Sequence, residues 1–311
     1  MPPMATAKSD AEGRITRDML DYYDEKSKGG YLSLIIIEHS FISEDGRASR
    51  NQLSIADDGV VDGLKKLSET IHKNGSKAVM QINHAGSLAR KDVNTAPVGP
   101  SPVVNPRGLT DIVPKELTAD DIKKLTDNFK RAAARVKKAG FDGVEIHSAH
   151  GYLLDQFISP MTNKRNDEYG GDIHGRIKFH LEVIRAVREA VGNEYPVLLR
   201  LGATDDTPAG LTPEDAVAAA RSFEEAGVDM IDISGGMCGY MPENSSEQGY
   251  FSVLSQAIKK AVKIPVILTG GITEPSGAEK LLEEGKADFI GVGRVVLKDS
   301  RWVERAVESL R

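Results

Sequence analysis

The chain has almost no cysteine, no long hydrophobic run and no excess of positive charge. Cys238 is the one cysteine among 311 residues, so the chain can form no internal disulfide and lacks the several thiolates that an iron–sulfur cluster needs. No stretch approaches the roughly 18 apolar residues of a membrane-spanning helix, and no basic segment followed by an apolar one opens the sequence. These absences predict a protein of a reducing compartment, the cytoplasm.

The formal net charge is −6, which leaves no basic footprint for nucleic acid or for an anionic membrane surface. Hydrophobic residues make up 40% of the chain and charged residues 28%, as in ordinary globular proteins. The length suits either two domains or one large barrel. Because no charge block, low-complexity tract or clear linker divides the chain, we expect one domain over residues 1–311.

Short apolar runs alternate with amphipathic segments along the whole chain. Seven runs are typical of buried strands, at residues 32–37, 78–82, 143–147, 197–201, 229–233, 265–268 and 289–292. Amphipathic patterns predict helices between them, at about residues 59–73, 119–139, 173–190, 213–226, 253–262, 275–284 and 299–310. This strict alternation predicts a parallel sheet whose faces are covered by helices.

A TIM-type (β/α)8 barrel and a doubly wound open sheet both fit this alternation. Polar and glycine-rich residues follow strand after strand, which favours the rim of a barrel, because an open sheet gathers such residues near one switch point. We therefore predict an α/β barrel, although seven strands are one fewer than a closed barrel has. Five of the fourteen prolines fall within residues 97–114, which predicts a long, lid-like loop at about residues 95–117.

Three side chains that can donate protons stand at the end of the predicted strand 143–147. His147, His150 and Tyr152 can converge on a small volume if the backbone turns there, and such groups can hold a developing oxyanion or protonate carbon. Two histidines are also a possible metal pair, but no third ligand stands at a diagnostic spacing. The alternative is structural: two hydrogen-bonded histidines at the barrel rim and a packed tyrosine.

Polar groups in other predicted strands are further candidates. Arg200 is an isolated charge in a buried strand, so it must bind a ligand or form an ion pair with Glu145 or Asp232. Gln81 lies in a similar position at the end of another strand. Its amide can hydrogen-bond the edge of a heterocyclic ring or take a purely structural capping role.

Two glycine-rich turns follow the last two predicted strands and contain Gly271 and Gly293. In barrels of this kind, the backbone N–H groups of such turns commonly bind phosphate, and Arg294 would add a charge-assisted contact. The pattern therefore predicts a ligand that carries phosphate. The alternative is that the glycines only permit tight turns.

Seven motifs occur in a characteristic order: PPMAT at residues 2–6, LIIIEHSF, MQINHAG, GVEIHSAHGYLLDQFISPMTNKRNDEYGG, LLRLGA, ILTGGI and IGVGR. In content and order they resemble the Old Yellow Enzyme family of flavin-dependent ene-reductases. Within that family, the chain is most similar to bacterial NADH:flavin oxidoreductases, including the flavin domains of 2-enoate and bile-acid reductases. The resemblance covers essentially the whole chain, so it carries implications for the cofactor and for the reaction.

The resemblance implies a barrel that holds FMN non-covalently at its C-terminal mouth, with NADH or NADPH as electron donor. The implied flavin contacts are Pro3, Met4 and Ala5 behind the isoalloxazine, His39 near the flavin, Gln81 at the pyrimidine edge, Arg200 beside N1 and O2, and Gly271, Gly293 and Arg294 at the phosphate. In this arrangement, positive charge beside N1 stabilises the anionic reduced flavin.

The implied reaction is reduction of the activated C=C bond of a small α,β-unsaturated carbonyl compound. His147 and His150 would bind the carbonyl oxygen, the β-carbon would take a hydride from flavin N5, and Tyr152 would protonate the α-carbon. Two alternatives stay open: an NADH oxidase or quinone-type flavin reductase, and a flavin-free lyase or isomerase that binds a phosphorylated substrate. The resemblance also allows a homo-oligomer, since relatives are often dimers or larger.

The chain departs from the family pattern at several positions. It opens at the PPMAT segment, so we expect the barrel to lack the family's first strand and N-terminal hairpin. Ala5 stands where many relatives have a cysteine or threonine that touches the flavin, and His39 stands where a small residue is frequent. Ser87 replaces the arginine that usually follows the HAG motif, which leaves the substrate preference open.

Overall fold

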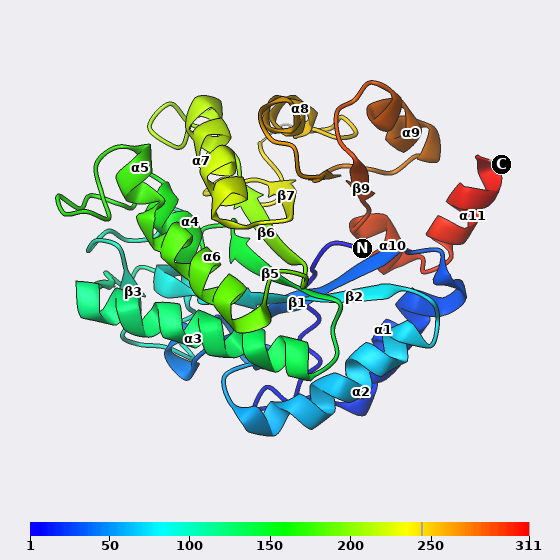
Figure 1. The fold of residues 1–311 in the computed structure, drawn as a ribbon, viewed down its shortest axis with the longest axis horizontal. Helices are drawn as coiled ribbons and strands as arrows, with labels where there is room; N and C mark the ends of the chain where they lie inside the picture. Colours follow the sequence, from blue (N-terminus) through cyan, green and yellow to red (C-terminus); the bar gives the residue numbers. More distant parts are fainter. Residues whose placement is uncertain (244, 311) are drawn as a thin grey trace.

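The computed structural model describes residues 1–243 and 245–310. Seven parallel strands form its main sheet, in the order β1-β2-β5-β6-β7-β8-β9. The strands are β1 (Leu34–Phe41), β2 (Lys77–Asn83), β5 (Gly143–Ser148), β6 (Val197–Gly202), β7 (Met230–Ser234), β8 (Val266–Thr269) and β9 (Phe289–Gly291). The sheet is curled, with helices on its outside (Figure 1). The predicted α/β barrel with seven strands is therefore confirmed.

The helices that cover the sheet include all seven that the sequence predicts. They are α1 (Arg17–Ser27), α2 (Val61–His72), α3 (Ala119–Lys138), α4 (Leu153–Ile158), α5 (Ile173–Arg176), α6 (Lys178–Val191), α7 (Pro213–Ala226), α8 (Ser252–Ala261), α9 (Pro275–Glu283), α10 (Arg294–Lys298) and α11 (Trp302–Ser309). Four short 3₁₀ helices are also present: η1 (Lys28–Gly30), η2 (Glu44–Gly46), η3 (Asp58–Val60) and η4 (Gly86–Leu88). None of the described helices is long and apolar enough to span a membrane.

The predicted helix starts are set by capping residues. Thr118 begins α3 by accepting a hydrogen bond from the backbone N–H of Asp121 at 3.2 Å, and the Asp121 carboxylate accepts one from the backbone N–H of Thr118. The Thr212 hydroxyl caps α7 by accepting from the backbone N–H of Asp215 at 3.1 Å, ahead of Pro213. Gly227 then ends α7 with φ +108°, a left-handed conformation that favours glycine.

Inward-pointing side chains at every second strand position form layers in the barrel interior. Ile36, Val79, Leu198 and Ile267 form a small buried cluster of their own, apart from the main core that the helices cover. Because side chains two residues apart share a face of a strand, the residue two positions further along each strand points to the same interior. This rule places Glu38, Gln81, Arg200 and Thr269 in the next layer, toward the C-terminal ends of the strands. A polar layer therefore lies between the apolar floor and the mouth.

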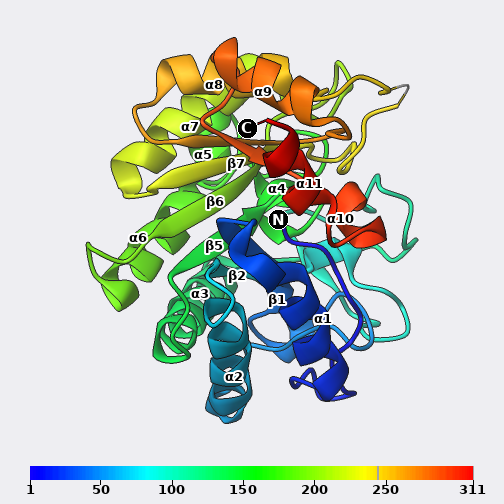
Figure 2. The same cartoon turned by 90° about the vertical axis from the view of Figure 1, so that its right-hand side faces the viewer.

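Strands β1 and β9 are the two ends of the sheet, and no backbone pairing joins them within the described residues. Met1 lies beside β1: its N donates to the carbonyl of Leu34 at 2.8 Å, and the N–H of Ile36 donates to the carbonyl of Met1 at 3.0 Å. A cavity of about 250 Å³ adjoins this seam, lined by Met1 and by Trp302 of α11 among others. The N-terminus accordingly lies close to β1 and the C-terminal helices (Figure 2).

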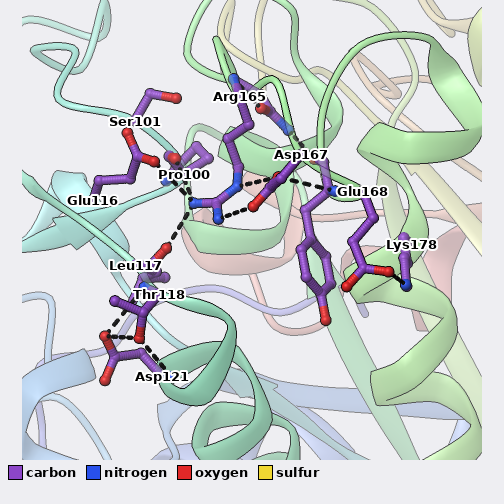
Figure 3. A network of polar contacts seen from close by, with 12 residues as sticks. Pro100, Ser101, Glu116, Leu117, Thr118, Asp121, Arg165, Asp167, Glu168 and Lys178 are labelled. Atoms are coloured by element: carbon purple, nitrogen blue, oxygen red, sulfur yellow. Dashed lines mark hydrogen bonds and ion pairs between the residues drawn. The ribbon is translucent and has the colours of Figure 1, made fainter.

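The proline-rich loop contains two short strands, β3 (Val98–Gly99) and β4 (Lys115–Glu116), which pair in parallel. Arg165 fastens both ends of this loop from a distant part of the chain (Figure 3). Its Nη1 donates to the carbonyl of Pro100 at 3.0 Å and to the carbonyl of Leu117 at 2.7 Å, while Asp167 pairs with the other side of the guanidinium. The loop is thereby held as an ordered structure over the barrel.

Candidate active site

A cavity of about 440 Å³ opens at the C-terminal ends of the barrel strands. Eight of the nine predicted flavin-binding residues line it: Pro3, Met4, Ala5, His39, Arg200, Gly271, Gly293 and Arg294. Two of the three predicted catalytic residues, His150 and Tyr152, line it as well. The structure thus brings together residues that are spread over almost the whole chain, and the volume suits a small-molecule site.

His147, His150 and Tyr152 form a compact group of rings. The ring centroid of His147 lies 5.2 Å from that of His150 and 5.1 Å from that of Tyr152. The backbone turn that the sequence required is present: His150 has φ +61° and Gly151 has φ +79°, both in the left-handed region. His147 is buried and does not line the cavity, whereas His150 and Tyr152 do.

Burial keeps the two histidines neutral and the tyrosine protonated. Desolvation lowers the pKa of His147 well below its usual value, and the neighbouring His150 lowers it further. The pKa of His150 is also well below the usual value, because of burial first and the positive charge of Arg200 second. Burial raises the pKa of Tyr152 to about 12. At neutral pH this site therefore offers neutral hydrogen-bond donors rather than cations.

His39 contacts the phenol of Tyr152, and its tautomer can be deduced. The carbonyl oxygen of the Gln52 side chain accepts from the backbone of Ala48 at 2.6 Å, so the amide nitrogen of Gln52 faces His39 and lies 2.7 Å from Nδ1. Nδ1 must then be the acceptor. Burial lowers the pKa of His39 to about 4, so the neutral ring carries its proton on Nε2, which lies 3.4 Å from the Tyr152 hydroxyl.

Arg200 is almost fully buried at the base of the cavity. Its Nη1 lies 3.1 Å from Oδ2 of Asp232, without the alignment of a hydrogen bond, so the ion pair that the sequence left open is present with Asp232. Its Nη2 is 3.5 Å from the hydroxyl of Ser234, which also lies 2.7 Å from Nε2 of His150. Within the described residues, Nε and Nη1 of Arg200 have no hydrogen-bond acceptor, so the guanidinium can still bind a ligand.

Gln81 is the predicted flavin contact that does not line the cavity. It is buried, and its amide nitrogen donates to Oε2 of Glu145 at 2.7 Å. Burial raises the pKa of Glu145 to about 8, and the negative charge of Asp232 contributes in the same direction. The amide nitrogen of Gln81 is therefore engaged within the polar layer, and its flavin contact stays a prediction.

Atoms of the protein itself lie close to the two glycine turns. A Cβ at Gly271 would lie 2.6 Å from the carbonyl oxygen of Glu247, and its φ is +69°. A Cβ at Gly293 would lie 3.3 Å from the sulfur of Met4, which joins this turn to the N-terminal segment. Arg294 follows directly and lines the same cavity. The predicted phosphate-binding residues and the N-terminal segment therefore share one wall.

The sequence profile of the NADH:flavin oxidoreductase / NADH oxidase family matches residues 1–311. The chain belongs to this family. A NADH oxidase of Thermoanaerobacter brockii is 41% identical over 315 residues, which cover 99% of this chain and 48% of that protein. An NADPH dehydrogenase of Clostridium acetobutylicum is 39% identical over 307 residues, which cover 97% of this chain and 88% of that protein. The chain therefore spans only about half the length of the first of these relatives.

A solved Old Yellow Enzyme homologue from Zymomonas mobilis superposes on this chain with a TM-score of 0.86. The two are 28% identical, and the match covers 100% of this chain and 88% of the other. The resemblance to the Old Yellow Enzyme family is thus confirmed. The unpartnered donors of Arg200, together with the glycine turns beside Arg294, fit a flavin mononucleotide.

Three residues of the site had not been singled out from the sequence: Gln52, Ser234 and Arg107. Ser234 could have been found, because it lies two positions beyond Asp232 on the same interior face of β7. Gln52 and Arg107 lie in loops, where no periodicity indicates which side chains point to the site. Gln52 contacts the site through His39, and Arg107 lines the cavity directly.

Proposed function

We propose that the protein reduces the C=C bond of a small α,β-unsaturated carbonyl compound, using NADH or NADPH as the electron donor. The observation that carries the proposal is the convergence of His147, His150 and Tyr152 beside the cavity at the end of β5. We also propose that the described residues form one FMN-binding domain. When bound, FMN would supply the hydride that the substrate accepts.

Each neutral imidazole has one N–H to donate. His150 lines the cavity and the ring of His147 lies 5.2 Å from it, so we propose that both donate to the carbonyl oxygen of a substrate. The negative charge that develops on this oxygen during reduction is stabilised by donors already in place, in a site with little water. A neutral donor also avoids the large desolvation penalty that a buried imidazolium would carry. His150 is held for this role by Ser234, whose hydroxyl lies 2.7 Å from its Nε2.

Tyr152 is the proposed proton donor to the α-carbon. Its pKa of about 12 keeps the phenol protonated at any physiological pH, so the proton is available when the enolate forms. The Nε2–H of His39 points toward the phenolic oxygen and can stabilise the negative charge left after the proton has moved. Tyr152 would then be reprotonated from solvent.

The proposed flavin-binding residues surround this group on the remaining walls of the cavity. Arg200 would lie beside the ring system and Arg294 beside the phosphate. We propose that the flavin-binding residues are Pro3, Met4, Ala5, His39, Gln81, Arg200, Gly271, Gly293 and Arg294.

Anaerobic stopped-flow absorbance of the FMN-loaded protein tests the proposal. The flavin is first reduced with NADH and then mixed with cyclohexenone or with buffer. We expect the oxidised flavin band to return much faster with cyclohexenone than with buffer alone. Equal rates would remove C=C reduction as the function.

One observation favours a second candidate function: a relative that is 41% identical is named an NADH oxidase. In an oxidase, molecular oxygen rather than an unsaturated carbonyl compound takes the electrons. Mixing the reduced protein with air-saturated buffer gives the oxygen rate. A reoxidation by oxygen that outpaces every enone tested would favour the oxidase.

A further inference from the structure

A third arginine faces the cavity without a counter-charge. Arg107, Arg200 and Arg294 line this cavity, and in the part of the chain that the structure describes no aspartate or glutamate does. Arg200 has Asp232 behind it, and Arg294 stands at the proposed phosphate site. Arg107 comes from the loop between β3 and β4. Its Nη1 is buried and has no hydrogen-bond partner among the described residues.

No acidic side chain nearby accounts for this charge. The charge of Arg107 acts on Asp155, whose Oδ1 is also buried without a partner in the described part of the chain and whose Oδ2 accepts from the backbone N–H of Gly151 at 2.6 Å. Burial raises the pKa of Asp155 well above its usual value and the charge of Asp205 raises it further, while the charge of Arg107 lowers it. Arg107 as a whole is half-buried, but a buried guanidinium N–H that lacks a partner is unfavourable unless a ligand supplies the acceptor.

The fold makes room for the Arg107 side chain at two glycines. A Cβ at Gly151 would lie 2.7 Å from Cγ of Arg107, and a Cβ at Gly239 would lie 2.8 Å from Cζ. Either contact is far shorter than van der Waals distance, so any other residue at these positions would displace the guanidinium. Gly151 directly follows His150, which places the Arg107 side chain beside the proposed catalytic group.

The backbone of Arg107 is also fixed in place. The side chain of Asn105, 1% exposed, accepts from the N–H of Arg107 at 3.0 Å and donates to the carbonyl of Gly151 at 3.0 Å. The same amide donates to the hydroxyl of Ser87 at 3.0 Å. Because Arg165 fastens both ends of the loop (Figure 3), Arg107 is held ready and little conformational entropy is lost when a ligand binds.

The mouth of the cavity is apolar on the side of this arginine. Leu109, two residues further along the loop, is 62% exposed, and Tyr240, next to Gly239, is 57% exposed. Both line the cavity together with Arg107. A ligand that binds here meets apolar surface and one positive charge, which suits a molecule with an apolar body and an anionic group.

We propose that Arg107 binds a carboxylate on the unsaturated substrate, so that the preferred substrates are amphipathic anions. The inference rests on the proposed function, because it names the substrate class of the same site. The phosphates of NAD(P)H offer similar anionic oxygens, and both partners would use this cavity in turn. The experiment therefore measures the two separately.

Isothermal titration calorimetry of the FMN-loaded protein with para-hydroxybenzoate and with its methyl ester tests the inference. The two probes share the phenol and the ring, and the ester replaces the carboxylate charge with a neutral methyl ester group. We expect the wild-type protein to bind the carboxylate more tightly than the ester. In Arg107→Gln, the Kd of the carboxylate should rise about 10- to 100-fold, and that of the ester less than about threefold.

Arg90→Gln is the matched control, because Arg90 is an exposed arginine that contacts Asp92 outside the cavity. It should leave both dissociation constants unchanged. Arg107→Lys keeps the charge without the planar fork and should give an intermediate loss for the carboxylate. The comparison of the two probes on the wild-type protein requires no variant, so equal binding of both probes would overturn the inference even if Arg107→Gln folds poorly.

Three results would overturn the inference. The wild-type protein could bind both probes equally, or Arg107→Gln could weaken both by the same factor, which would mean a structural role. A rise in the KM for NADH as large as the rise in Kd for the carboxylate would assign Arg107 to the nucleotide instead. If enone reduction is absent while the charge preference in calorimetry persists, the proposed function fails and the anion site stands.

Discussion

Nε2 of His39 lies 3.4 Å from the phenolic oxygen of Tyr152, 113 positions away in the sequence. The side-chain amide of Gln52 donates to Nδ1 of the same ring, so the ring proton is on Nε2. His39 therefore acts as a donor toward Tyr152. The phenol then accepts from His39 and keeps its own proton free for another acceptor. This relationship makes His39 a positioning residue for the proposed proton donor.

Replacing His39 by alanine removes this donor from Tyr152. We expect the reoxidation of reduced flavin by cyclohexenone to slow by about 3- to 10-fold, since one neutral hydrogen bond is lost. His39→Gln is the rescue variant, because an amide nitrogen can donate from a similar position. Anaerobic stopped-flow measures both. A glutamine variant as slow as the alanine variant would mean that His39 acts by packing alone.

Tyr152→Phe removes the proposed proton and little else. We expect reoxidation by cyclohexenone to be about 100- to 1,000-fold slower, within the range for loss of a general acid, while reduction of the flavin by NADH is nearly intact. Tyr195→Phe is the control, because that hydroxyl bonds the carbonyl of Phe141, away from the cavity. Equal loss in both half-reactions would remove Tyr152 from the role of proton donor.

His147→Ala tests the oxyanion site by binding rather than by turnover. A phenolate mimics the enolate that the histidines would stabilise, so we expect the Kd of phenolic ligands to rise about 10-fold when one donor is lost. Titration of the oxidised flavin band measures this Kd. The matched variant His72→Ala changes a histidine at the end of α2 that pairs with Asp142, and it should bind phenols normally. Unchanged binding in His147→Ala would contradict the oxyanion site.

The strands and most helices could be predicted because their signals are local. Apolar runs define the seven strands, and caps such as Thr118 and Thr212 define helix starts to the residue. Helix α1 escaped prediction because its sequence is largely polar and only a few side chains, Met19 and Tyr23 among them, are buried. The predicted helix 173–190 divides at Ile177 into α5 and α6, a detail that amphipathic periodicity cannot resolve.

The candidate site was predictable where a residue ends a strand and hidden where it lies in a loop. Arg200 and His147 follow from strand alternation and an unusual charge. Arg107 depends on Asn105, Gly151 and Gly239 for its position, and only the folded chain brings these residues together. Loop residues of this kind carry function without any periodic signal.

The raised pKa of Glu38 predicts that the stability of the protein depends on pH. Burial raises the pKa of its carboxyl to about 7, against bonds from the backbone and hydroxyl of Thr6 that lower it. A folded-state pKa above the unfolded value means that the folded state binds more protons, so this stabilisation is present below about pH 4.5 and is lost as pH rises through 7.

The substitution Glu38→Gln removes this titration. Relative to wild type, we expect the free energy of unfolding of the variant to increase by about 3 kcal/mol between pH 4.5 and pH 7.5, because 1.4 kcal/mol corresponds to one pKa unit. Urea unfolding at several pH values measures the difference, in which the contributions of other groups cancel. A difference that is independent of pH would place the folded-state pKa of Glu38 at its ordinary value.

The variant Arg165→Met tests whether the site depends on an ordered proline-rich loop. In Arg165→Met, the carbonyls of Pro100 and Leu117 lose their donor and Asp167 loses its partner, which should lower the free energy of unfolding by about 3 kcal/mol. Arg17→Met, at a side chain that is 84% exposed, should change it by less than about 0.5 kcal/mol.

Arg165→Met should also expose residues 97–117 to limited proteolysis. It should weaken the binding of para-hydroxybenzoate, because Arg107 would no longer be held in place. Binding of the methyl ester should fall less, since only the charged contact depends on the guanidinium. Faster cleavage of the loop with an unchanged Kd for the carboxylate would show that Asn105 and the two glycines suffice to position Arg107. Unchanged cleavage would mean that the contacts of Arg165 do not control the loop at all.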